Sequence, residues 1–320
     1  MSGPTKVVAI SGGIGGAKLA LGLYRVLPAD SLMVVCNTGD DFEHLGLSIS
    51  PDLDTVLYTL AGIANPDTGW GRAEETWSFM RALESLGGES WFRLGDGDLA
   101  LHVERTRRLA AGESLSAVSD DLCQRLGVRA RVVPMSDQPV RTLVHTDDGI
   151  LAFQRYFVQN RCEPEVTGFT FHGAGDAHPS LPLWETLIGG DLEAVVICPS
   201  NPFISIDPIL AVPGLRGAIA DCDAPVIAVS PIIGNNAVKG PTAKMMSELG
   251  VPQSARSVAE HYDGLLTGFV VDDTDQGVVT DVPCLHTPIL METEDQKIAL
   301  ATQVLDFARL IGQEVVGTSQ

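Results

Sequence analysis

Positive charge is scarce in this sequence. Its 320 residues carry 21 Lys and Arg against 41 Asp and Glu, a formal net charge of −20 at pH 7. Such a balance repels a polyanion at long range, and no run of basic residues offsets it, so a nucleic-acid partner is not expected. A phosphate-bearing ligand would need backbone N–H groups, a few placed Lys or Arg side chains, or a metal ion.

Cysteine is also sparse. The six cysteines form no C-x-x-C pair and no Cys/His cluster at zinc spacing, so we interpret them as free thiols of a reducing compartment. The N-terminal residues fit neither a signal peptide nor a membrane span, and we expect a cytoplasmic protein that does not enter a membrane. No nucleophile elbow, H-E-x-x-H motif or Ser-His-Asp order is present.

A repeated pattern indicates the fold class. Short apolar runs at 6–10, 32–36, 194–198, 225–230 and 268–271 are each followed by a loop rich in Gly, Asp, Asn or Pro. The pattern predicts a doubly wound, mostly parallel α/β sheet with helices on both faces. We assign residues 1–66 and 181–320 to a nucleotide-binding α/β core. Residues 67–180 read as an insertion, helical at first and then a β-hairpin that turns at Asp148-Gly149.

The first candidate ligand loop is rich in glycine. Gly12, Gly13, Gly15, Gly16 and Lys18 lie between the first strand and an expected helix at 19–26. Glycines let a backbone approach a ligand closely, and a helix N-terminus offers N–H groups to a phosphate. The loop matches neither the full dinucleotide fingerprint nor a P-loop, and a tight turn without a ligand is the alternative.

Two acidic loops follow the second strand. The first contains Asn37 and Asp40, and the second contains Asp52 and Asp54. Carboxylates at the carboxyl end of a parallel strand suit Mg²⁺, which takes one or two of them and leaves other positions to phosphate oxygens and water. For Asp52, an alternative role is to begin a helix as its N-cap.

Further loops offer ring-binding and nucleotide-binding groups. Trp91 and Arg93 beside the glycine-rich turn at Asp96 can form a wall for a planar ring, or the turn can simply lead into a helix at 98–108 capped by Asp98. After later strands, the chain presents Ser200 and Asn201, and then Lys239 ahead of a helix at 242–249.

These motifs, taken in order, resemble the CofD/FbiA family, the 2-phospho-L-lactate transferases of coenzyme F-420 biosynthesis. The resemblance rests on the glycine loop, N-T-G-D-D at 37–41, S-P-D-L-D-T at 50–55, G-W-G at 69–71, P-S-N-P at 199–202 and S-P-I-I at 230–233. It implies transfer of a phospho-linked three-carbon acid, namely 2-phospholactate, phosphoenolpyruvate or phosphoglycerate. The donor is a guanosine diphosphate conjugate, the acceptor is the terminal hydroxyl of the deazaflavin Fo, and GMP is released.

The resemblance also implies residue roles. Asp40 and Asp54 become the catalytic acids and Mg²⁺ ligands, with Asp54 orienting or deprotonating the Fo hydroxyl. The substrate-binding set is Gly12, Gly13, Gly15, Gly16, Lys18, Asn37, Asp54, Trp91, Arg93, Asp96, Ser200, Asn201 and Lys239. Many relatives carry a basic residue where this chain has Gly97, so the ring-side basic role falls to Arg93. The family's homodimer is carried over as an expectation.

Two other hypotheses remain open from the sequence. The first is a non-catalytic nucleotide-binding or regulatory protein on the same scaffold, which would not need Asp40 and Asp54 as metal-site carboxylates. The second is an NAD-dependent oxidoreductase, which the broken fingerprint disfavours, as do Cys36 and Asn37 at the end of the second strand where an acidic residue is expected.

Overall fold

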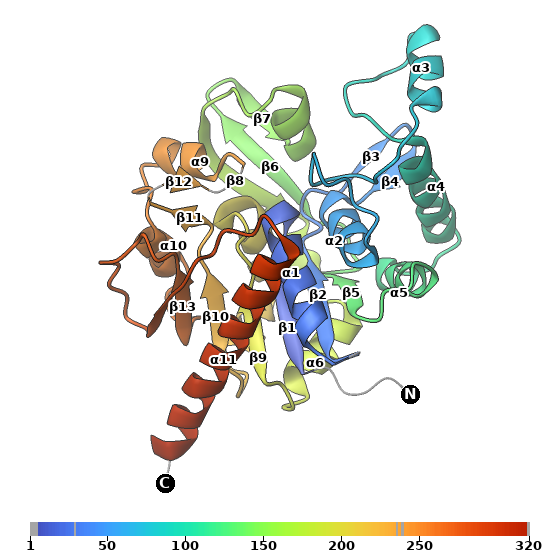
Figure 1. Cartoon of the computed structure of the whole chain (residues 1–320). Coiled ribbons are helices and arrows are strands. Elements are labelled where there is room, and N and C mark those ends of the chain that lie inside the picture. Colours follow the sequence, from blue (N-terminus) through green and yellow to red (C-terminus); the bar gives the residue numbers. More distant parts are fainter. Residues whose placement is uncertain (1–5, 29, 235, 238–239, 319–320) are drawn as a thin grey trace.

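The computed structural model describes residues 6–28, 30–234, 236–237 and 240–318, and it contains a seven-stranded sheet (Figure 1). All neighbouring strands in this sheet run parallel, which confirms the predicted α/β class. The strand order is β14 (Cys284–His286), β13 (Gly268–Val271), β10 (Val226–Val229), β9 (Ala194–Ile197), β1 (Val7–Ser11), β2 (Leu32–Cys36) and β5 (Arg131–Pro134).

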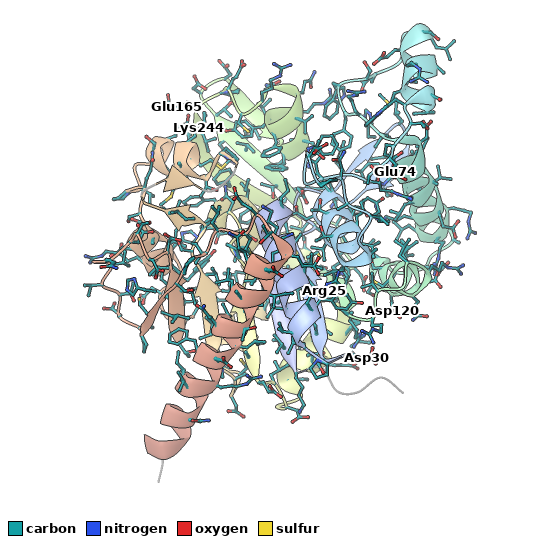
Figure 2. All side chains as sticks on the ribbon, in the orientation of Figure 1. Arg25, Asp30, Glu74, Asp120, Glu165 and Lys244 are labelled. Carbon is teal, nitrogen blue, oxygen red and sulfur yellow. The ribbon has the colours of Figure 1, made fainter. Side chains whose placement is uncertain are left out.

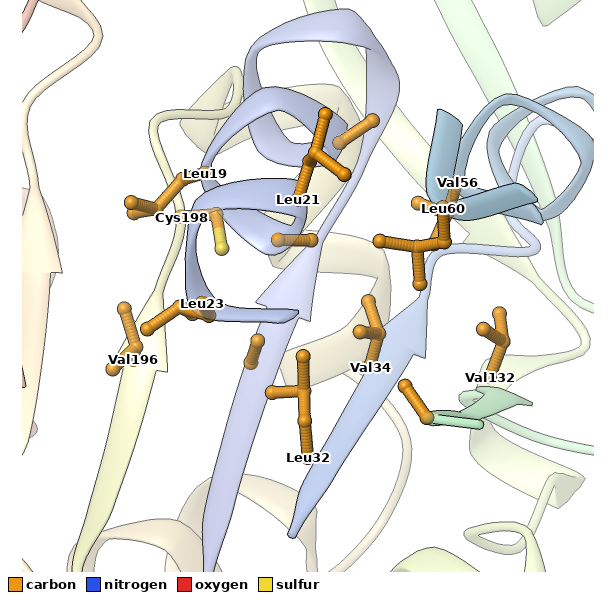
Figure 3. Close-up of a cluster of buried hydrophobic side chains, with 14 of the residues drawn as sticks. Leu19, Leu21, Leu23, Leu32, Val34, Val56, Leu60, Val132, Val196 and Cys198 are labelled. Carbon is orange, nitrogen blue, oxygen red and sulfur yellow. The ribbon is translucent and has the colours of Figure 1, made fainter. Parts of the chain in front are cut away.

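The sheet is covered on both faces, which explains the uninterrupted apolar runs. Alternate residues of β1 point to opposite sides: Val7 and Ala9 join one core cluster, whereas Val8 and Ile10 join the other. Helices α1 (Gly13–Val26), α2 (Pro51–Ala61), α5 (Leu115–Arg125) and α11 (Glu294–Thr318) cover the first face. Figure 3 shows part of this cluster between α1, α2 and the strands beneath them.

Helix α1 begins earlier than predicted, at Gly13 instead of residue 19. The glycine-rich segment is therefore the first turn of the helix and not a loop ahead of it. Near the C-terminal end of α1, Arg25 (labelled in Figure 2) forms an ion pair with Glu294 at the start of α11. The distance from Arg25 Nε to Glu294 Oε1 is 2.8 Å. Gly22 lets the two helices approach closely, since a Cβ there would collide with the carbonyl of Lys297.

The opposite face is covered by shorter elements: α6 (Leu181–Ile188), the π-helix η3 (Pro202–Ile206), α7 (Asp207–Leu210), α8 (Leu215–Ala220), α9 (Thr242–Glu248) and α10 (Ala255–His261). A short hairpin of β11 (Ile232–Ile233) and β12 (Asn236–Ala237) precedes α9. Among the described residues, no helix is both long enough and apolar enough to cross a bilayer.

The segment between β2 and α6 adds several elements around the sheet. β3 (Phe42–His44) pairs with β4 (Leu47–Ile49), and the helices α3 (Ser78–Ser85) and α4 (Asp96–Ala110) follow α2. After β5, the strands β6 (Arg141–Thr146), β7 (Gly149–Ala152) and β8 (Val166–His172) form an antiparallel sheet. The hairpin predicted at Asp148-Gly149 is confirmed, because β6 and β7 flank it.

Two local predictions in this segment are wrong. The alternation of apolar and polar residues from 150 to 157 predicts a strand of that length, but β7 ends at Ala152 and the chain then forms the π-helix η1 (Arg155–Gln159). The short helix η2 (Ala174–Asp176) follows β8. Helix α4 begins at Asp96, so Asp98 lies in its first turn and is not the N-cap. The Asp98 carboxylate instead accepts a hydrogen bond of 2.6 Å from the Tyr58 hydroxyl.

Candidate active site

A cavity of about 550 Å³ opens at the carboxyl edge of the central strands. This volume is typical of a small-molecule site. The loops after β1, β2, β9 and β10 all contribute to its wall, as expected for a ligand site in a parallel sheet. The lining residues used below are Gly12, Gly13, Gly15, Lys18, Asn37, Asp40, Asp52, Thr55, Trp70, Trp91, Phe92, Arg93, Phe153, Gln154, Phe157, Ser200, Asn201, Ser205 and Thr242.

The start of α1 is packed against neighbouring loops. The Gly12 N–H donates to Ser200 Oγ at 3.1 Å, and the Gly13 N–H donates to Asp52 Oδ1 at 2.6 Å. A Cβ on Gly15 would collide with the carbonyl of Pro199, and one on Gly16 with the hydroxyl of Ser11. These glycines therefore serve close backbone approach, and any phosphate at this helix end would meet the later amides of the first turn.

A buried polar cluster forms the floor of the cavity. The Asn37 side chain joins two carboxylates, donating through Nδ2 to Asp52 Oδ2 at 3.0 Å and to Asp40 Oδ1 at 3.4 Å. Asn37 Oδ1 accepts from the Gly39 N–H at 2.7 Å, which fixes the orientation of the amide. Gln154 donates to the Asp40 carbonyl at 3.1 Å from the opposite wall. The Asp40 and Asp52 side chains are thus oriented on one surface of the cavity.

Burial makes this cluster costly to ionise. The pKa of Asp40 is raised well above its ordinary value, by burial first and then by repulsion from Asp52 and Asp41. Burial raises the pKa of Asp52 to about 6, although the hydrogen bonds from Asn37 and Gly13 act in the opposite direction. Burial likewise raises the pKa of Asp41 to about 7. A cation between Asp40 and Asp52 would relieve this repulsion, so the oxygen-rich floor fits a hard divalent ion.

Asp54 lies on the other side of α2, outside the residues that line the cavity. Its carboxylate pairs with both terminal nitrogens of Arg105 on α4, and the Arg105 side chain is fully buried. His102 stands beside this pair, with Nδ1 3.7 Å from Asp54 Oδ2 and Nε2 3.2 Å from Asp98 Oδ1. The family resemblance predicts that Asp54 contacts the substrate. In the structure, its carboxylate instead forms a buried ion pair with Arg105.

The same network contains a possible metal-binding group. One ligand atom each from Asp54, Asp98 and His102 lies within 4.8 Å of the others, so these side chains can hold a metal ion. Asp40, which was paired with Asp54 in the sequence prediction, is not part of this group. A metal here would compete with the Arg105 guanidinium for the Asp54 oxygens.

Aromatic side chains form another part of the cavity wall. Trp91 and Phe92 come from the loop before α4, and their rings lie 5.7 Å apart at 68°. Phe153 and Phe157, on either side of the start of η1, stack at 5.2 Å. Arg93 lines the cavity while its guanidinium stacks over the ring of Trp77 at 4.3 Å. This part of the wall offers flat apolar surfaces suited to a planar ring.

The turn at Asp96 is structural in this arrangement. The Asp96 carboxylate accepts hydrogen bonds of 3.0 Å from the first-turn amides of Ser78 and Phe79 in α3. In return, Glu75 accepts from the Gly97 and Asp98 amides at 2.7 Å, at the start of α4. This reciprocal capping holds the turn and explains Gly97, since a Cβ there would press against Glu75.

The cavity thus gathers most of the predicted site residues. Asn37, Asp40, Trp91, Arg93, Ser200, Asn201 and Lys18 line it, together with Gly12, Gly13 and Gly15. Gly16, Asp54 and Asp96 do not, for the packing, ion-pair and capping reasons given above. Lys239 lies outside the described residues. Asn201 also caps η3, where its Oδ1 accepts from the Phe203 N–H at 2.9 Å.

Several lining residues were missed from the sequence. The sequence leaves Asp52 open between a Mg²⁺ ligand and a helix N-cap, and no sequence signal marks Gln154 as a site residue. The proximity of Asp52 to Asp40 follows from the approach of the start of α2 to the loop after β2, which no local sequence pattern reports. For Phe153 and Phe157, the only indication was two aromatic residues four apart.

Comparison with known proteins places this geometry in context. Residues 7–287 match the family model described as 2-phospho-L-lactate transferase CofD. The chain is 42% identical over 314 residues to a phosphoenolpyruvate transferase of Streptomyces griseus, covering 95% of this chain and 98% of that protein. It is 37% identical over 307 residues to a 2-phospho-L-lactate transferase of Methanocaldococcus jannaschii, and the match covers 94% of this chain and 97% of that protein.

A solved structure supports the fold. The crystal structure of a UPF0052-family protein from Bacillus halodurans superposes with a TM-score of 0.63 at 16% identity, covering 95% of this chain and 99% of that one. At this identity the likeness concerns the fold alone. The family match and the full-length relatives show more: this chain belongs to the 2-phospho-L-lactate transferase CofD family.

Proposed function

We propose that the chain transfers a phospho-linked three-carbon acid, lactyl or enolpyruvyl, from a guanosine diphosphate conjugate to the terminal hydroxyl of Fo in F420 biosynthesis. The acceptor oxygen attacks the phosphorus that carries the acid, the bond between that phosphorus and the GMP phosphate oxygen breaks, and GMP leaves. The hydroxyl proton passes to a carboxylate or to solvent. Full-length similarity to transferases of both acid types supports this reaction class.

One structural observation carries the proposal. A single cavity joins the glycine-rich start of α1, the carboxylates of Asp40 and Asp52, and an aromatic wall at Trp91 and Phe157. A donor with phosphates and an acceptor with a flat ring need these three surfaces side by side. In a loose phosphoryl-transfer transition state, positioning and charge neutralisation matter more than a strong base.

We assign the metal side of the reaction to Asp40 and Asp52. Both line the cavity, and Asn37 orients both of them. When bound, Mg²⁺ would supply neutralisation of the donor phosphate charge. Asp54 acts in this proposal by anchoring α2 to Arg105, and thereby fixing the helix that presents Asp52.

The two substrates are assigned to different parts of the cavity wall. Gly15, Lys18, Ser200 and Asn201 face the nucleotide side, which agrees with the end of a parallel sheet where phosphates bind. Trp91 and the neighbouring aromatic rings face the acceptor.

A cytoplasmic location and a homodimer remain predictions. The six cysteines are all free, which fits a reducing compartment.

A mass-spectrometric end-point assay tests the function. Purified protein is incubated with Fo, Mg²⁺ and equal amounts of the guanylylated lactate, enolpyruvate and glycerate donors, with a parallel sample in EDTA. We expect a new deazaflavin phosphodiester and GMP in the Mg²⁺ sample only, and the product mass identifies the acid. Folded protein that binds the nucleotide and forms no product from any donor would support a non-catalytic binding protein instead.

A further inference from the structure

Arg155 joins two walls of the cavity mouth. Its guanidinium stacks on the ring of Trp91, with Cζ 4.3 Å from the ring centroid. Its Nη2 lies 3.5 Å from Glu89 Oε2, and the same oxygen accepts a hydrogen bond of 3.0 Å from Trp91 Nε1. Glu89 therefore holds the edge of the indole while Arg155 covers one of its faces.

The three residues belong to separate parts of the fold. Glu89 and Trp91 lie in the loop between α3 and α4, whereas Arg155 begins η1, about 60 residues later in the chain. π-helical turns are frequent at functional sites. On both sides of Arg155, the residues Phe153, Gln154 and Phe157 line the cavity. The contact therefore ties the Trp91 wall to the segment that carries the opposing aromatic rings.

Arg155 supports Trp91 from outside the cavity. In the part of the chain that the structure describes, Trp91 belongs to the lining and Arg155 does not. Three rings also contact the indole: His44 at 5.2 Å and 69° and Phe92 at 5.7 Å and 68° are edge-on, and Phe42 at 6.0 Å is tilted by 41°. Among the described residues, Arg155 is the cation that stacks over the face of this indole, and Glu89 holds the indole N–H.

We propose that Arg155 is a positioning residue for the acceptor, acting with Glu89 to hold Trp91 as a fixed wall against the acceptor ring. The inference rests on the proposed function for the identity of the acceptor. If the Trp91 side chain is already held in the orientation that binds the acceptor, less side-chain entropy is lost on binding. The contribution of Arg155 should therefore be to acceptor affinity. The ion pair alone contributes little because both side chains are partly exposed, at 41% and 59%. The stacking is the larger contribution, since a cation over Trp is the strongest cation–π pair.

Matched variants separate charge from shape. Arg155→Lys keeps a cation over the ring, Arg155→Gln removes it, and Glu89→Gln removes the anion. Arg256→Gln serves as the control, because Arg256 forms an exposed pair with Glu260 on α10, away from the cavity lining. Each variant is assayed for kcat and for KM of both the acceptor and the donor.

For Arg155→Gln we expect the acceptor KM to rise about threefold to fivefold, with kcat and donor KM within twofold. Arg155→Lys should recover most of the loss, and Arg256→Gln should match the wild type. Unchanged acceptor KM in Arg155→Gln would overturn the inference. So would a fall in acceptor KM, since Arg155 would then obstruct the ring and not support its wall.

A second readout does not need activity. In protein labelled with 5-fluorotryptophan, the Trp91 ¹⁹F resonance is assigned with Trp91→Phe. We expect this resonance to shift or broaden in Arg155→Gln and to return towards the wild-type position in Arg155→Lys. An unchanged resonance would refute the contact even if no transfer is seen, whereas a wild type that transfers nothing refutes only the proposed function.

Discussion

Asp52 accepts a hydrogen bond of 2.6 Å from the backbone N–H of Gly13. This bond joins the acidic floor of the cavity to the first turn of α1, so the carboxylate is oriented by a helix end as well as by Asn37. An anion at a helix N-terminus is favoured by the helix dipole. The glycine-rich start of α1 and the acidic floor of the cavity are thus built as one unit.

Removing the charge of Asp52 should stop catalysis without unfolding the protein. For Asp52→Asn we expect kcat to fall by about a hundredfold or more, because the cation that neutralises donor charge loses a ligand. The midpoint of the Mg²⁺ titration of activity should rise in the same variant. Asp221→Asn, at the exposed end of α8, is the control and should behave as wild type. Retained kcat in Asp52→Asn would remove Asp52 from the metal assignment.

Asp54 should act mainly on stability. Asp54→Asn leaves the buried Arg105 guanidinium without its counter-charge, which costs about 3–5 kcal/mol of unfolding free energy. The double variant Asp54→Leu/Arg105→Met should lose less than the sum of the single variants, and urea unfolding measures all of them. Wild-type stability together with lost turnover in Asp54→Asn would instead place Asp54 in the chemistry.

The metal-free protein should be more stable in mild acid than in base. The folded-state pKa of Asp52 is raised to about 6 and that of Asp41 to about 7, so the native state holds protons that the unfolded chain has released. Stability therefore falls as the pH rises from about 4 to about 7, by about 3 kcal/mol for Asp52 alone at about 1.4 kcal/mol per pKa unit. Urea unfolding in EDTA at pH 5 and pH 8 measures the part of this fall that lies above pH 5, about 1 kcal/mol for Asp52.

Two comparisons check its origin. Asp52→Asn should flatten the pH dependence, since it removes one of the titrating groups. Added Mg²⁺ should stabilise the protein more at pH 8 than at pH 5, because the ion binds the ionised carboxylates. A metal-free protein whose stability rises between pH 5 and pH 8 would contradict the burial of these charges.

Gly15 should tolerate no side chain. A Cβ there collides with the backbone carbonyl of Pro199, so Gly15→Ala should cost about 1–3 kcal/mol in unfolding free energy and displace the start of α1. Gly217→Ala is the matched control: it lies within α8 with open space around it, and should gain about 0.5–1 kcal/mol. Equal stability of the two variants would argue against the close approach of α1 to the loop after β9.

The sheet was predictable because its strands are buried on both faces. The strands at 7–11, 32–36 and 194–197 are buried on both faces, so their sequences are almost uninterrupted apolar runs. Each run is followed by a loop rich in Gly, Asp, Asn or Pro. The sequence also predicts that Asp52 and Asp54 face different sides of their helix. Residues two apart on an α-helix point about 200° apart, so both carboxylates cannot face one site.

Other features depend on contacts that no local pattern encodes. Asp96 reads as a ligand-side acid in the sequence, yet it caps α3, which precedes it by some ten residues. Arg105 stands close to Arg107 and Arg108 in the sequence, as on an exposed helix face, yet it is fully buried against Asp54, 51 residues away. In both cases a tertiary partner decides the role of a charged residue.

The strand order has a consequence for how the protein is made. β1 lies inside the sheet between β2 and β9, and β9 begins 183 residues after β1 ends. Helix α1 packs on α11, which ends at residue 318. During synthesis, β1 therefore waits with one edge unpaired until the 183 residues up to the start of β9 have been made. Pairings this distant in sequence are slow to form, so the nascent N-terminal half is an expected client of chaperones.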